Sequence, residues 1–80
     1  MAGGPVEVWL TQRNLAVRCR MYREDESGTE RSVRSLSMRG AQRELTTQLV
    51  LEGYVPAGRW ETATANAAGA ETMRRFRVAS

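Results

Sequence analysis

The segment SMRGAQRELTTQLVLEG, residues Ser37 to Gly53, is the one part of the chain whose residue pattern indicates a helix. Its apolar residues recur three and four positions apart, a spacing that places them on one helix face: Met38, Ala41, Leu45 and Leu49. The hydroxyl of Ser37 suits the first free amides of a helix, and Gly53 suits the left-handed conformation that ends one. We therefore predict a helix from Ser37 to Gly53. It carries no histidine or cysteine, so we expect it to serve packing.

Two stretches before this helix alternate between apolar and polar residues, as strands do. In the first, from Val6 to Leu10, the inward apolar residues are at even positions. In the second, from Leu15 to Arg23, they are at odd positions: Leu15, Val17, Cys19 and Met21. Because the parity changes between the two strands, we predict a tight turn or a bulge at residues 12–14.

The residues after the second strand predict a hairpin. Residues 24–30 are polar and contain one glycine, a composition typical of a hairpin loop. The return strand is expected from Arg31 to Ser37. Val33 and Leu36 cannot share one face of a regular strand, so we predict either a bulge at residues 34–35 or the exposure of one of these two side chains.

The residues after the helix predict a turn and a second hairpin. Residues Tyr54 to Gly58 are expected to turn the chain. Strands are then expected from Arg59 to Thr64 and from Thr72 to Val78. The loop between them contains Asn66 and Gly69, which are turn-forming residues.

Together these elements predict an α+β fold in the order ββαββ. Four strands, or five if the short N-terminal strand is counted separately, would form one antiparallel sheet with the helix on one face. The opposite face would be uncovered, which antiparallel sheets tolerate. We expect residues 1–5 to be a flexible tail and residues 6–80 to form a single domain. The part from Leu45 to Val78 resembles the end of small bacterial domains of unknown function, and this resemblance implies no activity.

The composition is that of an ordinary soluble domain, with 41% hydrophobic and 26% charged residues in a chain of 80. No apolar run approaches the roughly 18 residues that span a bilayer. The N-terminal residues also lack the apolar core of a signal peptide. We therefore expect a cytoplasmic protein that does not bind membranes. The single cysteine, Cys19, has no partner for an internal disulfide and is expected to be a small buried apolar residue.

The basic residues are unusual in type. All 12 are arginine, and the net charge is +3. The absence of lysine indicates a GC-rich genome, whose codons favour arginine. This mildly basic charge permits a nucleic acid or an acidic protein as partner without requiring one.

The residues needed for several kinds of chemistry are missing. Without histidine, and with one cysteine, the chain cannot form the usual zinc sites or the triads of nucleophilic hydrolases. It also contains no glycine-rich phosphate-binding motif. Carboxylates remain in the acidic loop at residues 24–26, and Glu44 and Glu52 lie eight residues apart on the helix. None of them is in a setting that indicates a tuned pKa, so we expect no enzyme, no cofactor and no bound metal.

Strand alternation predicts which side chains lie on the uncovered face of the sheet. If the apolar residues face the helix, the outward set contains five arginines and a tyrosine: Arg18, Arg20, Tyr22, Arg59, Arg75 and Arg77. Trp9 is expected to be an exposed contact, because Val8 and Leu10 take the inward positions. Trp60 and Phe76 are expected in the core.

Two functions are compatible with such a face. A basic sheet with aromatic side chains can hold a phosphate backbone. Outward strand positions are polar in any soluble protein, however, and charged faces suppress aggregation. We therefore expect a small non-enzymatic binding module that self-associates, as a dimer, through its open sheet face or its edge strands. The alternative is a nucleic-acid-binding protein that uses the arginine-rich face.

Overall fold

The computed structural model describes residues 4–23, 28–66 and 69–79. Over these residues the chain forms six strands and one helix: β1 (Val6–Arg13), β2 (Ala16–Arg23), β3 (Thr29–Arg31), α1 (Met38–Leu51), β4 (Tyr54–Pro56), β5 (Glu61–Asn66) and β6 (Gly69–Val78). The predicted class, an antiparallel α+β fold with the helix on one face, is confirmed. The predicted order ββαββ, with four or five strands, is wrong in detail because short strands flank the helix on both sides.

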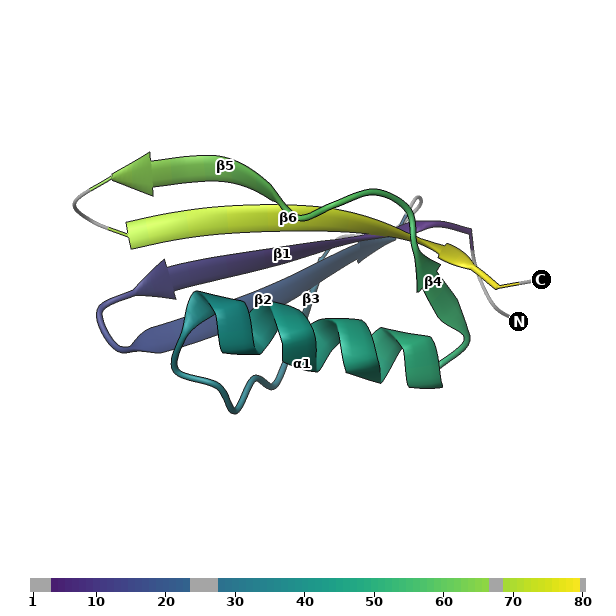
Figure 1. The fold of residues 1–80 in the computed structure, drawn as a ribbon, viewed down its shortest axis with the longest axis horizontal. Coiled ribbons are helices and arrows are strands. Elements are labelled where there is room, and N and C mark those ends of the chain that lie inside the picture. The colour runs from purple at the N-terminus through teal and green to yellow at the C-terminus, as the bar shows by residue number, and fades with distance from the viewer. Residues whose placement is uncertain (1–3, 24–27, 67–68, 80) are drawn as a thin grey trace.

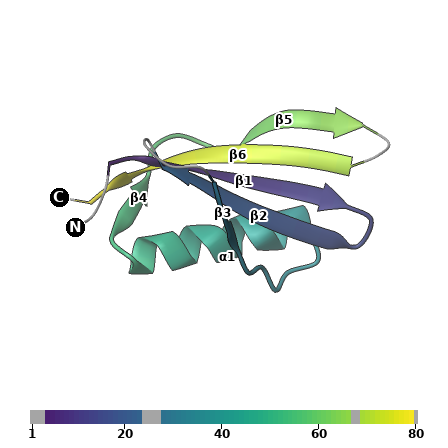
Figure 2. The same cartoon turned by 180° about the vertical axis from the view of Figure 1, so that it is seen from behind.

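The sheet is antiparallel throughout and is built around its first strand (Figures 1 and 2). The strand order is β3-β2-β1-β6-β4, and β5 also pairs with β6. Strands β4 and β5 pair with opposite ends of β6, so together they form one interrupted edge. The pairing of β1 with β6 therefore joins two segments that are distant in sequence at the middle of the sheet.

A two-residue turn joins β1 to β2 and explains the change of parity. Arg13 pairs with Ala16, and Asn14 between them has a φ of 56°, a conformation that asparagine tolerates well. Of the two predicted alternatives, a tight turn or a bulge at residues 12–14, the structure has the turn, but it lies at Asn14 and Leu15 because β1 runs to Arg13. The prediction that Leu15 faces the helix is wrong, because Leu15 lies in this turn and is 81% exposed.

The predicted return strand from Arg31 to Ser37 is also wrong, because β3 ends at Arg31. The carboxylate of Glu44 accepts hydrogen bonds from the backbone N–H groups of Arg34 (2.9 Å) and Ser35 (3.0 Å), so α1 holds this segment away from the sheet. The bulge expected at residues 34–35 is absent, and Leu36 is exposed instead. Within the described residues the register shift lies in β5, between residues 62 and 64.

The helix has the predicted ends and the predicted buried face. The Ser37 hydroxyl accepts a hydrogen bond from the Gly40 amide at 3.1 Å, and Gly53 has a φ of 97°. The apolar face of α1 packs on β1, β2 and β6 to form the core: Val6, Val8, Leu10, Val17, Cys19, Met21, Ala41, Leu45, Leu49, Tyr54 and Phe76. The helix therefore covers one face of the sheet.

The segment after the helix differs from its prediction. Tyr54 begins a short strand, β4, where only a turn was expected. The closing hairpin starts at Glu61 rather than Arg59, and its second strand starts at Gly69 rather than Thr72. Parts of the predicted N-terminal tail, of the acidic loop and of the second hairpin loop, at residues 1–3, 24–27 and 67–68, lie outside the described residues. No helix in the described part of the chain has the length and apolar character to cross a bilayer.

The open face of the sheet as a candidate binding site

The side of the sheet away from α1 carries no other element among the described residues, and we call it the open face (Figure 1). Its members follow from strand alternation and from the register of the paired strands. They are Glu7, Trp9, Thr11, Arg13, Ala16, Arg18, Arg20, Tyr22, Glu30, Val55, Glu61, Thr64, Glu71, Met73, Arg75 and Arg77.

One row of paired residues crosses the middle of the open face. Trp9 on β1 lies opposite Arg20 on β2 and opposite Met73 on β6. Beyond them, Glu30 of β3 lies opposite Arg20, and Glu61 of β5 lies opposite Met73. Trp9 and Met73 are half-buried, and the other three side chains are exposed. The row therefore has an apolar centre between charged ends.

The charges on the open face are nearly balanced. The open face carries five arginines and four glutamates, and the Nε of Arg75 donates a hydrogen bond to the Glu7 carboxylate at 3.2 Å. The strand alternation placed arginines and Glu61 on this face, but the sequence prediction did not place Glu7, Glu30 and Glu71 beside them. Alternation within β1 and β6 contained that signal, since Glu7 and Glu71 share parity with Trp9 and Met73.

In the half of the face nearest the β1–β2 turn, charges of opposite sign separate. Arg18 and Arg20 lie on β2, whereas Glu61 and Glu71 lie on β5 and β6. The apolar centre lies between the two groups. Glu30 of β3 lies beyond Arg20, so this half of the open face has one side with a net positive charge and one side that is negative.

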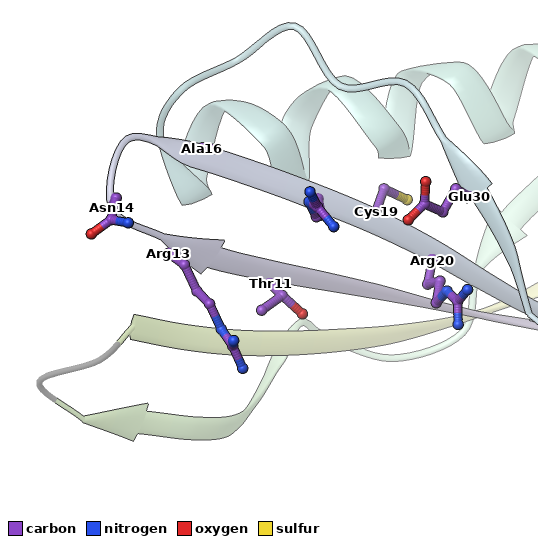
Figure 3. Close-up of a pocket in the computed structure, with 8 residues that line it drawn as sticks. Thr11, Arg13, Asn14, Ala16, Cys19, Arg20 and Glu30 are labelled. Atoms are coloured by element: carbon purple, nitrogen blue, oxygen red, sulfur yellow. The ribbon is translucent and has the colours of Figure 1, made fainter.

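On the positive side, three arginines surround a hollow of about 670 Å³. Figure 3 shows Thr11 and Arg13 of β1, Arg20 of β2 and Glu30 of β3 around it. Arg18 completes the arginine set. Sequence reasoning missed Arg13 because it ended the first strand at Leu10.

The other predicted site residues divide into two groups. Tyr22, Arg75 and Arg77 lie on the open face with Trp9, as expected. Arg59 does not join them through a strand, because it lies in the segment between β4 and β5. The ion pairs found among the described residues join Arg31 to Glu52 and Arg75 to Glu7, so the arginines around the hollow have no carboxylate partner in this part of the chain.

The carboxylates on the helix are engaged in structural contacts. Hydrogen bonds from Arg34 and Ser35 lower the pKa of Glu44, and those from Arg31 lower the pKa of Glu52. Burial raises the pKa of the Cys19 thiol to about 11, which keeps it protonated at neutral pH. Over the described residues, no group of histidine, cysteine and acidic side chains is arranged to hold a metal.

Comparison with known proteins supplies no relative. No family model, curated protein or solved structure matches the chain. What the open face does must therefore be inferred from its own geometry.

Proposed function

We propose that this protein is a non-enzymatic binding module that forms a dimer through its open face. The observation that carries the proposal is the arrangement of that face, where half-buried Trp9 and Met73 lie between a positive and a negative side. A surface of this kind is complementary to a second copy of itself, because a two-fold axis brings unlike sides together.

A specific geometry satisfies this complementarity. A two-fold axis that runs parallel to the strands, between β1 and β6, exchanges β1 with β6 and β2 with β5. Trp9 then faces Met73 of the second copy, and Arg20 faces Glu61 of the second copy. Aligned sheets pack in this way at about 10 Å. An indole and a thioether also make favourable contacts.

The size of the molecule allows such an interface. Its accessible surface is 5632 Å², and a standard interface buries about 800 Å² on each partner, roughly one seventh of that area. A dimer would also add apolar burial to a chain whose own core is small. The open face can supply both the interface area and the apolar side chains, Trp9 and Met73, that such a dimer would bury.

A charge exchange between Arg20 and Glu61 tests the dimer. We expect Arg20→Glu alone and Glu61→Arg alone to be monomers, because each places like charges opposite one another in both halves of the interface. An equimolar mixture of the two variants should form a heterodimer, since every facing pair then has opposite signs. Sedimentation equilibrium of each protein and of the mixture measures this.

The control for this experiment is Arg59→Glu. It makes the same charge change at an exposed arginine outside the strands, and the dimer should persist. A wild-type protein that stays monomeric at high concentration contradicts the proposal. Single variants that dimerise as well as the wild type contradict the proposed geometry.

Nucleic-acid binding is a second candidate, and one observation favours it. Arg13, Arg18 and Arg20 line one hollow together with Glu30, and none of the three arginines is in an ion pair among the described residues, so the hollow has a net positive charge that suits phosphate oxygens. The balanced charge of the whole face opposes an extended phosphate track. We propose that any such contact is confined to the hollow.

Fluorescence anisotropy with labelled single-stranded DNA and RNA separates the two candidates. Contacts from three arginines predict an affinity that falls with salt with a logarithmic slope of about −2. The double variant Arg13→Glu, Arg18→Glu should abolish this binding. Arg18 belongs to the positive side of the open face, so the same variant should also weaken the dimer, and the salt dependence of nucleic-acid binding is the measurement that separates the two candidates. If the affinity does not change with salt, or if the double variant still binds, the proposed phosphate contact in the hollow is excluded.

A further inference from the structure

A second cluster of arginines lies on the helix side of the sheet, away from the open face. It lines a groove of about 430 Å³ between α1, β6 and the segment that precedes β5. The side chains that matter are Arg39 and Arg43 of α1, Arg74 of β6, and Trp60. Among the described residues, no carboxylate lines the groove. It is therefore a shallow, wide-open groove whose charged lining residues are all positive.

The positions of the two helix arginines, Arg39 and Arg43, lower the stability of the fold. Arg39 and Arg43 are four residues apart on α1, so their side chains are neighbours and repel each other. Arg39 also lies in the first turn, where the helix dipole disfavours a cation, and no acidic residue in that turn offsets it. An anion in the groove would relieve both effects.

The third arginine is oriented by the rest of the fold. The Nε of Arg74 donates to the Gly58 carbonyl at 2.8 Å, and its Cζ lies 5.7 Å from the centre of the Phe76 ring. No other hydrogen bond from Arg74 is found within the described residues, so its terminal nitrogens remain available. A guanidinium held in this way loses little freedom when it binds an anion.

Trp60 gives the groove an aromatic wall. Its ring packs edge-to-face against Phe76, with 6.4 Å between the ring centres, and it remains half-buried. One part of the indole is thus fixed to the core while the rest lines the groove. An indole beside a guanidinium cluster suits a ligand with an anionic end and an apolar or planar body.

We propose that this groove binds a small phosphate-bearing ligand, with the phosphate held by Arg39, Arg43 and Arg74 and its organic part against Trp60. Guanidinium groups match the geometry of phosphate oxygens and bind them with strong charge-assisted hydrogen bonds. This site goes beyond the proposed dimer, because none of its residues belongs to the open face.

Nuclear magnetic resonance of the two tryptophan indole N–H groups tests the site, because Trp60 lines the groove and Trp9 lies on the open face. The probes are inorganic phosphate, a nucleoside monophosphate, the same nucleoside without phosphate, and chloride at matched ionic strength. We expect both phosphate compounds to shift the Trp60 signal saturably. A saturable shift of the Trp9 signal alone would place the phosphate near Arg20 on the open face and would overturn the proposal. A Trp60 shift of the same size with the unphosphorylated nucleoside or with chloride overturns the proposal. The absence of a shift with both phosphate compounds also overturns it.

Variants identify the groups responsible. Arg39→Gln and Arg43→Gln should each weaken phosphate binding by about tenfold or more, which is the usual effect of losing a charge-assisted hydrogen bond. Arg59→Gln is the matched control, since Arg59 adjoins Trp60 in sequence but does not line the groove, and it should change nothing. Equal weakening by all three variants would show general charge attraction and would reject the site. Circular dichroism spectra confirm that each variant is folded.

Discussion

Gly69 is a residue at which a single methyl group should disturb the fold. It begins β6 with a φ of 152°, and a Cβ built there would overlap the carbonyl oxygen of Gln12 on the central strand. Gly53 also has a positive φ, of 97°, but a Cβ at that position meets nothing within 4 Å. The two glycines therefore separate the cost of conformation from the cost of a steric clash.

We expect Gly69→Ala to lower the free energy of unfolding by about 2 to 3 kcal/mol, because backbone strain and overlap with a core strand add. Gly53→Ala should cost only about 1 kcal/mol, which is the conformational term alone. Urea denaturation of both variants measures the difference. Equal losses of stability at the two positions would show that the backbone at Gln12 can move away from residue 69 without a further cost.

At the scale of elements, local pattern was sufficient where an element is stabilised by its own residues. The helix is an example: Ser37 and Gly53 mark its ends, and Ala41, Leu45 and Leu49 mark its buried face. The start of the β1–β2 hairpin is another, since the change of parity between the two alternating stretches predicts a turn or a bulge between them. These features depend on periodicities of 3.6 and 2 residues, which are read along the chain.

Local pattern failed where one element controls another. The strand predicted to run to Ser37 ends at Arg31, because Glu44 of the helix binds the backbone amides of Arg34 and Ser35 that a strand partner would otherwise bind. Residues Tyr54–Pro56 form a strand because the end of β6 lies beside them. Neither partner is close in sequence, so neither outcome is visible in a window of residues.

At the scale of the whole molecule, carboxylates that join the helix to the β3 side of the sheet should make the fold sensitive to acid. Glu52 bonds both terminal nitrogens of Arg31 at 2.7 and 2.8 Å, and Glu44 holds the segment after β3. Hydrogen bonds lower the pKa of each carboxyl in the folded state. Their stabilisation is therefore complete above the unfolded pKa of about 4.3 and is lost as the pH falls through the lower folded pKa.

We expect the free energy of unfolding of the wild type to fall as the pH is lowered from 6 to 3. Glu44→Gln should be less stable at neutral pH and should lose less on acidification, because its contribution no longer titrates. Glu30→Gln removes an exposed carboxylate that makes none of these hydrogen bonds, and it is the control for the loss of one negative charge. Urea denaturation at a series of pH values gives these profiles. If Glu44→Gln loses as much stability on acidification as the wild type, Glu44 is not a source of the acid sensitivity.

The sequence by itself determined the fold class, the bounds of the helix and the face on which most strand residues lie, because these depend on short-range periodicity. Only the tertiary structure decided the strand order, with β1 at the centre, and the pairing of β4 and β5 with one strand. It also decided which charges meet: Glu7 beside Arg75 on the open face, and Arg74 with Arg39 and Arg43 in the groove behind it. Such neighbours come from segments distant in the chain, and their pairing register depends on how the whole core packs.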